Sequence, residues 1–195
     1  MQQISRASYL IDVIRGGDAQ MIDYLKIFLG DHAALMTAEL ELIARCRNSN
    51  KEGETVPDLP RFLEQLASEV RNQKQTLLDL LSDMGGSRPV SKEMAGWVME
   101  KLGRLKMNGE WTKYSDLSRV VELEAMLMAS QSRVLLWETL VELDVRGETR
   151  RLSEAFLDRA KTHVDRLRIF YREATRIAFR ESEVPQRVKI PIQAD

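Results

Sequence analysis

Apolar residues recur every three or four positions in long stretches of this chain. Each stretch places its apolar side chains on one stripe of an α-helix, and strand-like alternation is absent. Helices of this length, roughly 40 Å at 1.5 Å per residue, bury their stripes by packing around a shared core. The pattern therefore predicts an all-α four-helix bundle, with helices over residues 19–46, 58–84, 115–143 and 151–180.

Glycine and proline separate the predicted helices. The segments NSNKEGETVPDLP (48–60) and MGGSRPVS (84–91) are typical of a polar loop and of a helix end followed by a turn. A smaller helix is predicted at 90–105, within a connection (85–114) long enough to cross the bundle. One long crossover between helices two and three is typical of ferritin-like bundles. We therefore expect a ferritin-like arrangement with a helical crossover.

The two ends of the chain are expected to lie outside these four helices. A segment that carries Ile4, Ile11 and Ile14 predicts a short N-terminal helix that ends at the glycines 16–17. The segment EVPQRVKIPIQAD (183–195) has two prolines and predicts an extended tail. The expected organisation is one helical domain over 1–182 followed by the tail.

Composition narrows the class of protein. Hydrophobic residues make up 44% and charged residues 30%, a balance typical of a soluble helical protein. A net charge of -1 and acids interleaved among the arginines disfavour nucleic-acid and membrane binding. No stretch is apolar enough to span a bilayer, and no signal peptide is evident, so cytoplasmic residence is expected. The single cysteine, Cys46, excludes an intramolecular disulfide and is expected to be an exposed thiol.

Each predicted apolar stripe contains a polar residue. Ferritin-like di-metal proteins use such inward positions for two glutamates and two Glu-x-x-His pairs, because two divalent cations need bridging carboxylates. This chain has no Glu-x-x-His sequence. The polar stripe residues are His32 and Glu39, Gln73, Ser130, and His163.

Two interpretations of these polar residues remain open. In the first, they hydrogen-bond to one another or at the ends of the core. In the second, His32, Glu39 and His163 bind a metal, with Glu69 on the margin of its stripe as a further candidate ligand. The metal would then be iron or manganese.

Two phrases resemble the bacterial ferritin-like family of YciF type, small stress-associated four-helix proteins. SEVRNQKQTLLDLLSDMGGSRP (68–89) resembles the family's second helix, and FLDRAKTHVDRLRIF (156–170) resembles its last, where Asp158 and Lys161 match. The resemblance covers about residues 19–180 and implies a ferritin-like fold with a di-iron centre.

The departures from that family fall on the metal-binding positions. Glu69 matches the family pattern, but the first-helix glutamate position reads Met36 or a neighbour and the second-helix histidine position reads Gln73. The third-helix glutamates fall on Ser130 and Arg133, and the fourth-helix acids on Arg159 and Ala160. A fixed cation at Arg133 would oppose metal entry. The resemblance therefore implies a retained fold without di-iron chemistry.

These observations favour a non-enzymatic bundle without a di-metal centre, catalytic residues or cofactor, which works through self-association or partner binding. The alternative is a metalloprotein, either a di-iron oxidase or an iron or manganese storage and detoxification protein. A third possibility is a small apolar ligand held between the helices near Ser130, Ala160 and Ala174, unless Trp137 or Phe170 fills that space.

Met126 and Met128 cannot both point inward. A second apolar face that would form a dimer is predicted at Tyr24, Phe28, Leu35, Leu127 and Leu135.

Overall fold

The computed structural model contains four long helices and, within the residues that it describes, no strand. These helices confirm the predicted all-α bundle, and each lies within a few residues of its predicted range. The largest difference is the start of the last helix, which begins at Gly147 rather than near residue 151. The helices are α2 (Ala19–Ser49), α3 (Leu59–Asp83), α5 (Asp116–Glu142) and α6 (Gly147–Ala178). The described residues are 19–50, 55–86, 114–143 and 147–180.

Three predicted elements lie outside the described residues. They are the short N-terminal helix, the crossover helix at 90–105 and the extended tail at 183–195. Their predictions therefore stay predictions.

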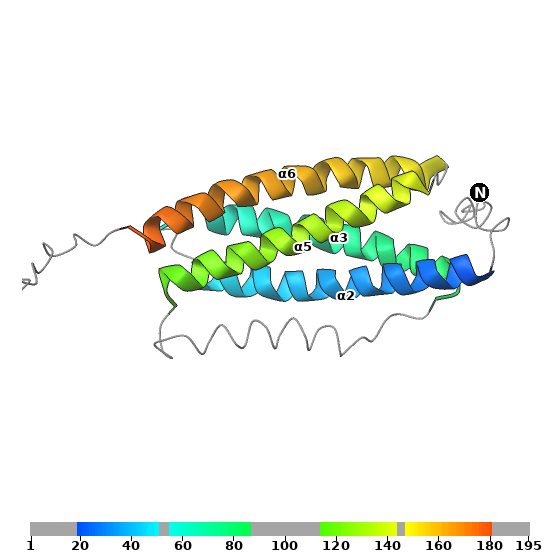
Figure 1. Cartoon of the computed structure of the whole chain (residues 1–195), viewed down its shortest axis with the longest axis horizontal. Helices are drawn as coiled ribbons and strands as arrows, with labels where there is room; N and C mark the ends of the chain where they lie inside the picture. Colours follow the sequence, from blue (N-terminus) through cyan, green and yellow to red (C-terminus); the bar gives the residue numbers. More distant parts are fainter. Residues whose placement is uncertain (1–18, 51–54, 87–113, 144–146, 181–195) are drawn as a thin grey trace, which may run out of the picture.

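The helices lie side by side along their lengths, and their directions alternate between neighbours (Figure 1). α3 ends at the end of the bundle where α2 began, whereas α5 begins at the opposite end. The end of α3 and the start of α5 therefore lie at opposite ends of the bundle, and the two helices run in the same direction. α2 packs on α3 and on α5, and α5 packs on α6, so each of these neighbouring pairs is antiparallel.

The glycine pair at the end of α3 stops the helix by backbone geometry. Gly85 has a φ of 71°, a left-handed conformation that other residues adopt only with strain. The N–H of Gly85 donates to the carbonyl of Ser82 and that of Gly86 to Leu81, both at 2.9 Å. This is the Schellman pattern of helix termination. The predicted helix stop is confirmed.

The start of α5 is also fixed locally. The Ser115 side chain accepts from the Ser118 N–H at 3.2 Å, and the Ser118 side chain accepts from the Ser115 N–H at 3.5 Å. This reciprocal capping satisfies two N–H groups that a helix start would leave unpaired. It fixes the residue at which α5 begins.

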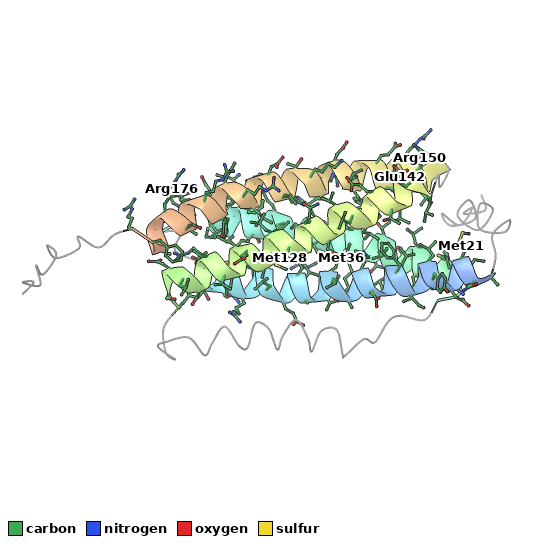
Figure 2. All side chains as sticks on the ribbon, viewed as in Figure 1. Met21, Met36, Met128, Glu142, Arg150 and Arg176 are labelled. Atoms are coloured by element: carbon green, nitrogen blue, oxygen red, sulfur yellow. The ribbon has the colours of Figure 1, made fainter. Side chains whose placement is uncertain are left out.

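The predicted stripes form the core. Apolar stripe residues such as Leu29, Leu63, Leu123 and Leu167 are fully buried, and all five polar stripe residues are buried beside them. Met126 is buried and Met128 is 69% exposed, so one of the two methionines does face outward, as expected. The side chains that fill the space between the helices, and those that leave its surface, are drawn in Figure 2.

The predicted second apolar face is only partly exposed. Tyr24 and Leu135 are well exposed, whereas Phe28, Leu35 and Leu127 are half-buried. Phe28 packs edge-on against the His32 ring, with 4.5 Å between ring centroids.

Candidate functional site

A buried ion pair lies at the centre of the bundle. The Arg133 guanidinium on α5 donates from Nε to Glu39 Oε2 at 2.8 Å and from Nη2 to Glu39 Oε1 at 3.0 Å. Glu39 is on α2, and both residues are at most 2% exposed. Ser130, one turn before Arg133, donates to Glu39 Oε1 at 3.0 Å and accepts from Arg133 Nη2 at 2.8 Å. The two parallel hydrogen bonds satisfy both carboxylate oxygens, as a strong charge-assisted pair requires.

The amide of Gln73 extends this network to α3. Its Oε1 accepts from Arg133 Nη1 at 3.2 Å and from Trp137 Nε1 at 2.9 Å. Both partners are donors without acceptor capacity, which fixes the orientation of the amide. Gln73 Nε2 has no partner among the described residues. The network therefore binds the oxygen of Gln73 firmly and leaves its nitrogen unsatisfied.

His163 connects the network to α6. Its Nδ1 lies 3.5 Å from Arg133 Nη1, and since arginine only donates, this nitrogen is the acceptor. Burial lowers the pKa of His163 to about 4, and the positive charges of Arg133, Arg166 and Arg159 add to that effect. The imidazole is therefore neutral at physiological pH. The network, defined here as the central network, takes side chains from all four helices: Glu39, Gln73, Ser130, Arg133, Trp137 and His163.

The structure does not bring the candidate metal ligands together. Glu39 and His163 both contact Arg133, but His32 Nδ1 lies 3.3 Å from Ser132 Oγ and its pKa is lowered by burial. Glu69 pairs with Arg159 at 3.0 Å on the surface between α3 and α6. In the described parts of the chain, no three His, Cys, Asp or Glu side chains are arranged to hold a metal ion.

The residues of the central network do not fit a di-metal cluster. Glu39 is its one carboxylate, and both oxygens of that carboxylate already accept from Arg133. A second cation in a weakly polarisable interior would be repelled by the guanidinium, and two divalent ions need several carboxylates for charge balance.

A second buried polar cluster lies towards one end of the bundle. Tyr114 donates its hydroxyl to Glu122 Oε2 at 2.8 Å and accepts from Asn50 Nδ2 at 2.9 Å. Arg119 Nε donates to Asn50 Oδ1 at 2.6 Å, and Glu122 also pairs with Arg45. These contacts join the end of α2 to the start of α5.

Cys46 belongs to this second cluster, so the prediction of an exposed thiol is wrong. Its side chain is fully buried, 3.8 Å from the Tyr114 hydroxyl. Burial and the nearby Glu122 carboxylate raise the pKa of the thiol to about 12. The thiol is therefore protonated and a poor nucleophile. Cys46 lies three positions after the fully buried Ile43, so the helical period of α2 places it inward although a polar loop follows the helix.

The interior space considered for an apolar ligand is filled. Trp137 packs against Phe156 with 4.8 Å between ring centroids, and Phe170 stacks on Phe62 at 5.0 Å. An open hollow of about 420 Å³ lies at the seam of α3 and α6, and His163 contributes to its lining. A smaller cavity of about 30 Å³ lies beside Trp137 and Ser153, between α3 and α6. That smaller volume suits a single water molecule as a partner for the otherwise unpartnered Ser153 hydroxyl.

Periodicity alone identified only part of the central network. It placed Glu39, Gln73, Ser130, Trp137 and His163 on the stripes, but Arg133 lies beside its stripe and was singled out only by the family resemblance. Glu122, Asn50 and Arg119 were not identified at all. A signal was present in the sequence: Arg119 and Arg133 are the only basic residues of α5, and both lie one residue from a stripe position.

Comparison with known proteins adds no identification, because no family model, curated protein or solved structure matches the chain. None of the helices in the described ranges combines the length and apolar character needed to cross a bilayer. The fold and the site therefore define a class only: an all-α four-helix bundle with a buried, ion-paired central network.

Proposed function

We propose that this protein is a non-enzymatic, ferritin-like helical scaffold in which an ion-paired network replaces the di-metal centre, and that it works through contacts with copies of itself or with another protein. The observation that carries the proposal is the position of Arg133, whose guanidinium binds both oxygens of Glu39 between the four helices. The ferritin-like part is supported by α3 and α5, which run in the same direction on either side of one long connection.

The chemistry of the interior supports a structural role. The neutral imidazole of His163 accepts from Arg133 through Nδ1, and the buried thiol of Cys46 is protonated. A general base or nucleophile needs access to substrate and a pKa near the working pH. Neither buried group meets those needs.

The metalloprotein alternative is tested by elemental analysis of protein purified from cells supplemented with iron and manganese. We expect metal far below one atom per chain, because both carboxylate oxygens of Glu39 already accept hydrogen bonds from Arg133. Near-stoichiometric iron or manganese that is lost in both Glu39→Gln and His163→Ala, but kept in Glu69→Gln, would overturn the proposal. Glu69 is the matched control, since its carboxylate lies on the surface with Arg159.

A further inference from the structure

The outward surface of α5 carries large apolar side chains that no described helix covers. Leu117 is 47% exposed, Met128 69% and Leu135 55%. Separations of eleven and seven residues put these three side chains on one stripe of a helix with 3.6 residues per turn. Aligned in this way, they form an apolar stripe along the outward side of α5.

The charges on the same surface are of one sign. Both arginines of α5 are buried, Arg119 at 5% exposure and Arg133 at 1%. The remaining charged side chains that reach the surface of α5 are acidic. Two of them, Glu124 and Glu142, lie on the same side of the helix as the exposed apolar residues. The acidic residues that reach the surface are Asp116, Glu124, Glu138 and Glu142.

The neighbouring helix, α6, is basic towards its end. Residues 166–180 contain five arginines and one glutamate. Arg168 and Arg172 are exposed and lie on one stripe with Phe179, which directly follows α6 and is 63% exposed. Asp165 lies beside Arg168 at 3.8 Å and only partly offsets this charge.

Outward residues of α5 and α6 lie at matching positions along the long axis of the bundle. Arg133 and His163 lie level with each other in the antiparallel pair α5–α6, as their contact at 3.5 Å shows. Glu124 is nine positions before Arg133 and Arg172 is nine after His163, so these two residues are also level. The same counting puts Leu117 level with Phe179. In Figure 2, Glu142 at the end of α5 lies near the start of α6 and Arg176 lies at the far end of α6, as expected for an antiparallel pair.

We propose that this α5–α6 face binds a second copy of the chain, in a dimer whose two-fold axis runs parallel to the helices. Such an axis keeps the height of every residue and places α5 of one protomer opposite α6 of its partner. Glu124 then faces Arg172 of the other protomer, and Leu117 faces its Phe179. Both contacts occur twice, as an isologous interface requires. This inference rests on the proposed function and specifies the partner as the protein itself.

The face is large enough for a stable dimer. α5 has 27 residues, which makes it about 40 Å long. Two adjacent helices spaced about 10 Å apart present roughly 20 Å of width, or about 800 Å² per protomer. Specific interfaces of standard size bury about that area on each side.

The test uses the full-length chain, sedimentation velocity over a wide range of protein concentration, and three charge variants. Glu124→Arg alone and Arg172→Glu alone should each raise the dimer dissociation constant by about tenfold or more, because each places like charges opposite one another twice. The double variant should restore dimers. An equimolar mixture of the two single variants should form mixed dimers, since both contacts in a mixed dimer join opposite charges.

The mixture separates contacts between chains from effects within one chain. Each chain in it still carries two like charges at positions 124 and 172, so only contacts between the two chains can restore the dimer. Glu64→Arg, an exposed reversal on α3, is the matched control and should leave the dimer unchanged. Circular dichroism should show equal helicity for all variants. A wild-type protein that stays monomeric, or a dimer unaffected by both single variants, overturns this inference and leaves the metal-free scaffold to be judged by elemental analysis.

Discussion

The buried charges of Arg133 and Glu39 depend on each other. Removing one partner of a buried ion pair typically costs about 3–5 kcal/mol, because the other charge remains in the interior uncompensated. We therefore expect Arg133→Met to lower the free energy of unfolding by about that amount, measured by urea denaturation. The surface variant Arg159→Met, which breaks the pair with Glu69, should cost less than about 1 kcal/mol.

A double variant separates the pair from the packing around it. In Glu39→Met with Arg133→Met, no charge is left buried and the volume of both side chains is largely kept. Replacing a buried ion pair by apolar residues is often neutral or stabilising. The double variant should regain most of the stability lost in Arg133→Met. A loss in the double variant equal to the sum of the losses in Glu39→Met alone and Arg133→Met alone would mean that the two residues act independently, and would contradict the pairing.

His163 makes the stability of the bundle depend on pH. Its pKa is about 4 in the folded protein, below the value of about 6.5 expected in the unfolded chain. Between these pH values the unfolded chain binds more protons than the folded protein. The contribution of His163 to the free energy of unfolding is therefore complete above pH 6.5 and is lost as the pH falls towards 4. The loss is on the order of 3 kcal/mol.

The measurement is urea denaturation at a series of pH values. His163→Asn keeps an acceptor near Arg133 but does not titrate, so its stability should vary less over that window. His32, whose pKa is also lowered by burial, should leave a residual slope of the same sign. An unchanged slope in His163→Asn would contradict the assignment.

At the scale of the element, the end of α3 is set by one glycine. A β-carbon at the positive φ of Gly85 costs about 1–2 kcal/mol through contact with the backbone. Gly85→Ala should therefore lower the melting temperature and destabilise the protein by about that amount. Ser82→Ala, an exposed change in the last turn of the same helix, should have little effect. Equal stability of Gly85→Ala and the wild type would exclude a role for the left-handed turn.

α5 is apolar on two sides. Its inward side carries Leu123 and Trp137 beside the buried arginines, and its outward side carries Leu117, Met128 and Leu135. A sequence stripe therefore identifies α5 as a helix, but it does not say which of the two apolar sides faces the core. The packing against α2 and α6 decides that.

At the scale of the whole molecule, the central network joins all four helices through one guanidinium. We expect Arg133→Met to reduce hydrogen-exchange protection in α2, α3, α5 and α6 together, because Glu39, Gln73 and His163 each lose a contact to the same group. Mass-spectrometric hydrogen exchange resolves each helix. Reduced protection confined to α5 would show that the network does not couple the helices.

The sequence by itself determined the four helices, their ends and most of the core. Spacing of three and four residues is a local property, and Gly85 stops a helix through its own backbone freedom. Stripe positions also pointed to Glu39, Gln73, Ser130 and His163 as inward polar groups.

Only the tertiary structure decided what those polar groups contact. The partners of Arg133 come from helices 30 to 94 positions away in the chain, and no local pattern encodes such pairings. The burial of Arg119, Glu122 and Asn50 likewise depends on helices meeting at one end of the bundle. Whether a charged residue beside a stripe is buried depends on whether polar or charged groups of another helix reach it, and that is a property of the packed molecule.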